Sequence, residues 1–134
     1  MHLRAAVPTL VTMRSLILSA ALAAALAAPA CAGVYPVSGN WGQSASSAKG
    51  PIDCIGKRVI GFNGDQRTDS HGGVPAYRNR TVTTAGPSQF RIVDEFSNGQ
   101  VSGGRTSYTL HQVDDDHIVM QMQGGTLKLQ RCKD

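Results

Sequence analysis

Aromatic side chains and charge are both scarce in this chain of 134 residues. It contains one Trp, three Tyr and three Phe, and its formal net charge is only +4. Proteins that bind nucleic acid usually present a strongly basic stripe with aromatic residues placed along it, and this sequence has no such stripe. We therefore expect no nucleic-acid partner.

Helical periodicity is absent from the chain after residue 32. Apolar and polar residues alternate there instead, and Gly and Asn punctuate the pattern, which indicates antiparallel β structure. We predict one all-β domain over residues 33–134, a small antiparallel β-barrel or highly curved meander sheet stapled by one disulfide.

The longest apolar run lies near the N-terminus, from Leu16 to Ala28, directly after Met13-Arg14. It ends in the small residues Ala28-Pro29-Ala30-Cys31-Ala32, which is typical of a cleavable, helical signal peptide. The run is too short and too rich in Ala for a membrane span. We interpret residues 1–32 as a signal peptide, with the true start at Met1 or Met13, and expect a periplasmic or secreted protein.

The signal-peptide interpretation determines how the three cysteines are expected to behave. Cleavage after Ala32 removes Cys31 and leaves Cys54 and Cys132, an even pair that predicts a disulfide in an exported domain. Such a long closed loop stabilises the fold by about 4 kcal/mol in the chain-entropy description. The alternative is lipidation of Cys31, which would place the protein on a membrane surface.

The C-terminal third carries the clearest strand pattern. A two-residue turn within Gln123–Thr126 predicts pairing of Met122 with Leu127 and of Met120 with Leu129. The short loop Asp114–Asp116 predicts pairing of Leu110 with Met120. One face would then hold seven apolar side chains: Tyr108, Leu110, Ile118, Met120, Met122, Leu127 and Leu129. On that register Cys132 shares the polar face with Lys128 and Gln130.

A second hairpin is predicted at Asn98-Gly99, after a strand at Gln89–Ser97. A plain register would place Phe90 and Ile92 on the face opposite Tyr108. We therefore predict a β-bulge at Gly103-Gly104, which would set Phe90 against Tyr108.

The N-terminal half has a weaker pattern. Strands are expected to begin at Gly39, with Trp41 at one end of the core, and to cover Lys57–Phe62 and Tyr77–Thr84. The polar stretch from Asn63 to Ala76 is interpreted as a long loop, of the kind that is functional or mobile.

Candidate chemistry is sparse. His111 and His117 would lie diagonally on the polar faces of neighbouring strands, but no third metal ligand accompanies them, so we expect no metal. Asp114–Asp116 lacks the spacing of a calcium loop and is interpreted as a solvated turn. We expect no cofactor.

The loop at 63–76 contains Asp65, Asp69 and His71 without a nucleophile, so we expect no enzyme. Arg67 of this loop would form a small basic patch with Arg78 and Arg80, able to attract an anionic partner.

Both ends of the mature region resemble small exported proteins of unknown function from Gram-negative bacteria. The resemblance rests on Tyr35-Pro36-Val37-Ser38-Gly39-Asn40-Trp41, on Pro51-Ile52-Asp53-Cys54, and on the stretch from Gln121 to Cys132. It implies an exported domain and carries no activity.

Two shorter stretches are similar to families with known roles. Gly39-Asn40-Trp41 resembles the Gly-x-Trp that opens lipocalin-type barrels, which implies a small apolar ligand in a cavity beside Trp41. The stretch Val101–Tyr108 resembles the Ser-Gly…Tyr loop of periplasmic C-type lysozyme inhibitors, although its Tyr lies farther along the chain.

Taken together, the sequence predicts a monomeric, non-enzymatic binding or interaction module with a protein or small-molecule partner. A hydrolase inhibitor and a lipocalin-like carrier are the alternatives. Candidate partner-binding residues are Ser102, Gly103, Arg105, Tyr108, Arg67 and His71.

Overall fold

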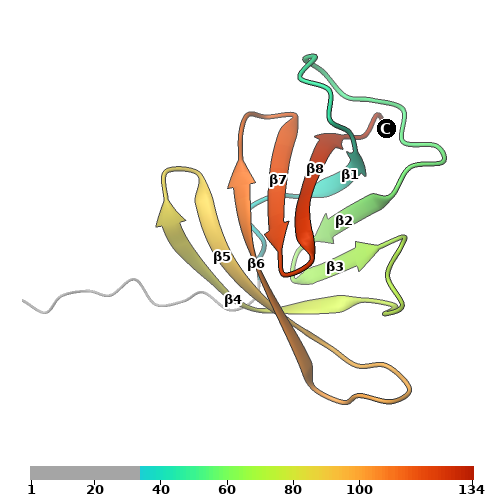
Figure 1. The fold of residues 1–134 in the computed structure, drawn as a ribbon, viewed down its shortest axis with the longest axis vertical. Coiled ribbons are helices and arrows are strands. Elements are labelled where there is room, and N and C mark those ends of the chain that lie inside the picture. The colour runs from blue at the N-terminus through green and yellow to red at the C-terminus, as the bar shows by residue number, and fades with distance from the viewer. Residues whose placement is uncertain (1–33) are drawn as a thin grey trace, which may run out of the picture.

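The computed structural model describes residues 34–134, so the predicted signal peptide and Cys31 lie outside the described residues. Eight strands follow one another along this part of the chain (Figure 1). Their bounds are β1 Gly39–Gln43, β2 Val59–Asn63, β3 Gln66–Asp69, β4 Tyr77–Gly86, β5 Gln89–Phe96, β6 Gly104–Gln112, β7 His117–Met122 and β8 Gly125–Arg131.

Each strand pairs antiparallel with the next along the chain, and β1 pairs with β8 to close the barrel. The predicted antiparallel barrel is therefore confirmed. The sheet is uneven, because β3 contributes only two residue pairs to β4, whereas β4 and β5 form a long hairpin that continues past β3. In Figure 1 this hairpin stands apart from the short strands β1 to β3.

Alternation along each strand places one set of side chains inside the barrel. The core contains the apolar residues predicted for the C-terminal strands, with Met122 packed partly buried against it. Ile60 and Phe62 of β2 face inward as predicted. The buried apolar set is Tyr35, Val37, Trp41, Ile60, Phe62, Ile92, Tyr108, Leu110, Ile118, Met120, Leu127 and Leu129.

The stretch from Asn63 to Ala76 is not one loop, which corrects the sequence prediction. Strand β3 lies within it and pairs with β2 from Ile60 to Asn63. The inward position of β3 is taken by Arg67, which is only 3% exposed. A charged residue at a core position hid the alternation from which strands are predicted.

The register of the last hairpin also differs from the prediction. Met122 pairs with Gly125 and Met120 pairs with Leu127, so Gln123 and Gly124 form the two-residue loop. The shift moves each pairing by two residues, and the period of a strand is two, so the same side chains still face the core. The predicted pairing of Leu110 with Met120 is confirmed.

The predicted β-bulge at Gly103-Gly104 is wrong. Pairing between β5 and β6 is regular from Phe96↔Gly104 to Gln89↔His111, which places Phe90 against Leu110. The correct facing arises because the hairpin loop runs from Ser97 to Gly103, where Asn98 Oδ1 accepts hydrogen bonds from the amides of Gln100 and Val101. The bulges lie instead in β4, between Asn79 and Thr81 and between Thr84 and Gly86.

The disulfide between Cys54 and Cys132 is present as predicted. Strand β8 ends at Arg131, and Cys132 then bridges Ile52 in parallel, so the disulfide lies on the outer side of the barrel, against Gly42 of β1. This placement explains why Cys132 shares the face of Gln130 and not that of Leu129. A disulfide of this kind fits an oxidising compartment outside the cytoplasm.

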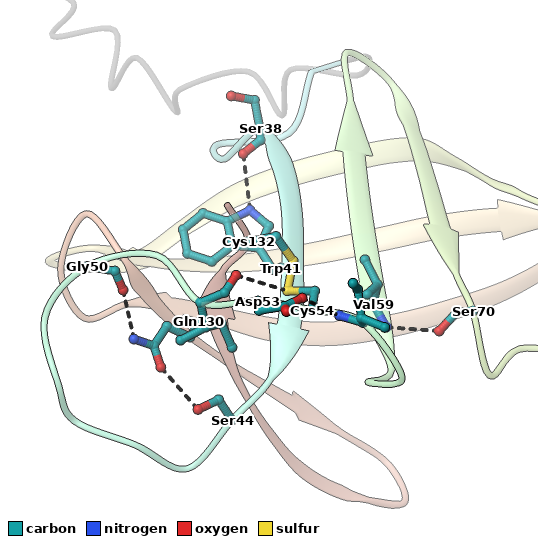
Figure 2. Close-up of a disulfide and its surroundings, with 12 residues drawn as sticks. Ser38, Trp41, Ser44, Gly50, Asp53, Cys54, Val59, Ser70, Gln130 and Cys132 are labelled. Carbon is teal, nitrogen blue, oxygen red and sulfur yellow. Dashed lines mark hydrogen bonds between the residues drawn. A yellow bond between two sulfur atoms is a disulfide. The ribbon is translucent and has the colours of Figure 1, made fainter. Parts of the chain in front are cut away.

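The long connection from Ser44 to Arg58 covers the outer face of β1 and β8 (Figure 2). Beneath it Gln130 is 1% exposed and fully hydrogen-bonded: Nε2 donates to the carbonyls of Ala48 and Gly50, and Oε1 accepts from Ser44 Oγ. Gln130 and the disulfide therefore fix the two ends of this cover to the barrel wall.

Close contact at the disulfide makes Gly42 a sensitive position. A Cβ at Gly42 would clash with Cys54 Sγ, whereas a Cβ at Gly124 would meet nothing within 4 Å. We expect Gly42→Ala to lower the free energy of unfolding by about 1–3 kcal/mol through overpacking, and Gly124→Ala to change it by less than about 0.5 kcal/mol. Urea denaturation of the oxidised proteins measures both, and equal midpoints for the two variants would contradict this packing.

Candidate functional site

Polar residues gather around one carboxylate inside the barrel. Asp94, on the inward face of β5, is completely buried. Its Oδ2 accepts hydrogen bonds from Arg67 Nε at 2.7 Å and from Tyr108 Oη at 3.0 Å. Its Oδ1 accepts from Tyr35 Oη at 2.9 Å and from Asn79 Nδ2 at 3.4 Å. Four donors from four segments of the chain thus satisfy one acid.

Aromatic rings enclose the Arg67 guanidinium within this cluster. Its central carbon lies 3.8 Å from the ring centre of Tyr77 and 5.0 Å from that of Tyr108. Cation–π contacts of this kind strengthen when the charge is withdrawn from water. The ion pair with Asp94 and the two rings together compensate for burying a guanidinium.

The buried phenols resist ionisation. Burial, followed by the charge of Asp94 and the hydrogen bond to it, raises the pKa of Tyr35 well above its ordinary value. Burial also raises the pKa of Tyr108. Neither hydroxyl is poised to give up a proton near neutral pH, and every oxygen of Asp94 is occupied, so this cluster is suited to holding strands together.

The interior cluster includes two of the predicted partner-binding residues. Arg67, expected in a basic patch, and Tyr108, predicted on the apolar face of its strand, are each 5% exposed or less, and both point toward Asp94. The physical reason is strand alternation. Arg67 occupies an inward position of β3, and Tyr108 lies on the same inward face of β6 as Leu110. The basic patch predicted around Arg67 therefore retains only Arg78 and Arg80.

Trp41 is also completely buried. Its Nε1 donates to the carbonyl of Ser38 (Figure 2). The Arg131 guanidinium lies 4.4 Å from its ring centre. The hollows described over residues 34–134 are open to the surface, and Trp41 lines none of them.

The predicted loop residues remain at the surface. Ser102 and Gly103 are exposed on the β5–β6 loop, which projects from the barrel in Figure 1, and Arg105 is exposed at the start of β6. His71 is exposed after β3. The structure does not bring His71 into an acid–base cluster.

Asp69 beside it already has a partner. The Arg58 guanidinium lies 2.7 Å from Asp69 Oδ2. Although burial raises the pKa of Asp69, the hydrogen bonds from Arg58 and from the His71 amide hold it below its ordinary value. Asp69 is therefore a fixed anion that joins the β1–β2 connection to the end of β3.

The two predicted surface histidines do not share a site. His117 Nδ1 lies 2.8 Å from Asp114 Oδ1, whereas His111 pairs across the sheet with Val119. Within residues 34–134 no group of three His, Cys, Asp or Glu side chains is arranged to hold a metal ion. That part of the chain also contains no helix long and apolar enough to cross a membrane.

The outer face of β4, β5 and β6 carries the densest charge that the strands present to solvent. Four exposed arginines lie on it, and Glu95 is its one acid. The four are Arg78 and Arg80 of β4, Arg91 of β5 and Arg105 of β6. We call this set of five side chains the arginine face.

The strand register places three of these arginines at positions next to Glu95. Arg78 pairs with Glu95 across the β4–β5 ladder, and Arg105 pairs with it across the β5–β6 ladder. The bulge between Asn79 and Thr81 inserts Arg80 on the same side, where its Nε lies 3.2 Å from Glu95 Oε2. Bulges commonly re-aim a side chain in this way.

A hollow of about 400 Å³ opens beside the arginine face. Its lining residues are Gln66, Ala76, Tyr77, Arg78, Arg80, Glu95, Phe96 and Ser97. Tyr77 and Phe96 pair across the ladder with the inward parity of Asn79 and Asp94, and their rings meet edge to face with centres 5.7 Å apart. Residues of the arginine face therefore line one side of an open hollow.

The sequence prediction did not include Asp94 or Glu95. Asp94 is two residues from Ile92 in β5 and therefore faces the core. An acid at a core position indicates a buried partner that compensates its charge. Glu95 and its arginines come from three strands, and only a correct register brings them together.

The chain matches no protein-family model, no curated protein and no solved structure. Functional inference therefore depends on the geometry of the interior cluster and of the arginine face.

Removing the buried acid tests the interior cluster. Asp94→Asn leaves the Arg67 charge without its partner, and we expect it to lower the free energy of unfolding by about 3–5 kcal/mol. The neighbouring change Glu95→Gln, on the opposite face of the same strand, should cost less than about 0.5 kcal/mol. Chemical denaturation compares the two, and similar midpoints would contradict the central role of Asp94.

Alkaline pH tests the same cluster through its phenols. The folded pKa values of Tyr35 and Tyr108 lie above the unfolded value of about 10, so their contribution is present below that pH and is lost as the pH rises past it. We expect the urea midpoint to fall from about pH 10 upward, and to fall less steeply in Tyr35→Phe, which lacks one phenol. Identical slopes in the two proteins would show that Tyr35 is not protected from ionisation.

Proposed function

We propose that this protein is a non-enzymatic binding module of the periplasm or the extracellular space, and that it docks an anionic partner on the arginine face. The observation that carries the proposal is the outer surface of β4–β6, where four exposed arginines accompany one glutamate. Arg side chains recognise carboxylate and phosphate groups through paired N–H donors.

The interior gives separate support for a role on the outside. Its acid, its guanidinium and two of its phenols are engaged with one another around Asp94. A reaction centre requires polar groups that remain available to a substrate. The proposal therefore assigns the Asp94 cluster to stability and the arginine face to recognition.

The carrier hypothesis receives less support. A lipocalin-like carrier requires an apolar cavity beside Trp41, and Trp41 is packed against Arg131 and lines none of the hollows described. The inhibitor hypothesis keeps exposed Ser102 and Gly103, which lie next to the arginine face, but it loses Tyr108 to the core.

Two exposed ion pairs involve the arginine face, one within it and one with Asp65 just before β3. Arg80 and Glu95 are 51% and 34% exposed, and Arg78 and Asp65, 3.8 Å apart, are 79% and 49% exposed. Exposed pairs of this kind contribute little to stability, so a partner displaces them at small cost.

Site-specific photo-crosslinking in the host's extracytoplasmic compartment tests the proposal. A photo-reactive residue at Ser107, exposed on the outer face of β6, should crosslink a partner, and the yield should fall several-fold when Arg105→Glu is added. The matched control is a photo-reactive residue at Thr126, exposed on β8. Equal yields from both positions, or a yield from Ser107 that is independent of Arg105, would contradict the proposal.

A further inference from the structure

Glu95 occupies the centre of the arginine face as an internal carboxylate. Arg78 and Arg105 pair with it from either side, and Arg80 holds its Oε2 at 3.2 Å. Arg80 therefore already binds a carboxylate, with Arg78 and Arg105 at the neighbouring ladder positions. This carboxylate belongs to a side chain that is 34% exposed and so is not locked in place.

We propose, building on the function proposed above, that the arginine face recognises acidic protein segments and that Glu95 is a built-in competitor of the ligand carboxylate. On binding, a carboxylate of the partner replaces Glu95 at Arg80 and takes the neighbouring Arg78 or Arg105 as a second donor.

The chemistry of the face favours carboxylates over phosphate polymers. Four arginines and one glutamate give this face a modest positive charge, spread over three strands. Binding of phosphate polymers depends on many neutralised charges, whereas one or two carboxylates need only the paired donors present here.

The surroundings of the face favour a protein segment over a membrane. Large apolar side chains exposed within residues 34–134 are Val34, Ile55, Val101 and Val113, and none of these lies on the outer face of β4–β6. A surface that binds a membrane stably needs buried apolar area in addition to basic charge.

The competitor gives the site a testable signature, because removing an acid should tighten binding to an acidic ligand. Isothermal titration calorimetry with poly-L-glutamate at low ionic strength measures this affinity. We expect Glu95→Gln to tighten binding about three- to fivefold and Arg80→Gln to weaken it by a similar factor, since exposed ion pairs contribute little on their own. Added salt should weaken both complexes.

Matched controls separate the site from net charge. Asp134→Asn, at the C-terminus, raises the net charge by the same amount as Glu95→Gln, and Lys128→Gln, at an exposed position of β8, matches Arg80→Gln. Neither control should change the affinity by more than the general effect of one charge. Equal tightening by Glu95→Gln and Asp134→Asn would overturn the competitor while leaving an arginine-dependent face in place.

Two further probes distinguish failure of this inference from failure of the proposed function. Arginine-dependent binding of inorganic polyphosphate, or of phosphatidylglycerol vesicles, without binding of poly-L-glutamate would overturn the acidic protein segment and retain an anion-binding face. Binding of all three probes that is unaffected by Arg80→Gln, or binding of none, would overturn both.

Discussion

The ion pair between Asp94 and Arg67 is the interaction on which the rest of this barrel depends. Strand β3 has four residues and joins β4 through only two residue pairs, so the sheet is weakest where these strands meet. Arg67 crosses the interior from β3 to β5 at this point, and Tyr35, Tyr108 and Asn79 complete the coordination of the acid. A buried ion pair is stable only when its remaining hydrogen bonds are satisfied, and this cluster meets that condition.

This constraint also decides where recognition takes place. The polar groups of the interior are hydrogen-bonded to one another, so few of them remain available to a ligand. Alternation along the same strands places the arginines on the outer face. The neighbours Asp94 and Glu95 of β5 illustrate both roles. Asp94 is buried and stabilises the core, whereas Glu95 is partly exposed on the arginine face. The disulfide and the Ser44–Arg58 connection cover the outer face of β1 and β8, whereas they leave the outer face of β4–β6 uncovered.

Sequence patterns predicted the parts of this fold that depend on periodicity. Because strand parity survives a register error of two residues, the core face of the C-terminal strands was correct even though the last hairpin turn was placed wrongly. The disulfide followed from counting cysteines. Strand β3 and the Asp94 cluster were missed because charged residues at inward positions imitate a loop, and Arg80 reaches Glu95 only through a bulge that the sequence does not mark.

Central to this account is the claim that the interior is structural and the outer wall binds. Titrating ¹⁵N-labelled protein with poly-L-glutamate and following its amide and indole NMR signals tests that claim directly. We expect shifts at the backbone amides of Arg78, Glu95 and Arg105, and much smaller shifts at the Trp41 indole and the Asp94 amide. Large shifts at Trp41, or shifts centred on the disulfide and β8, would contradict it.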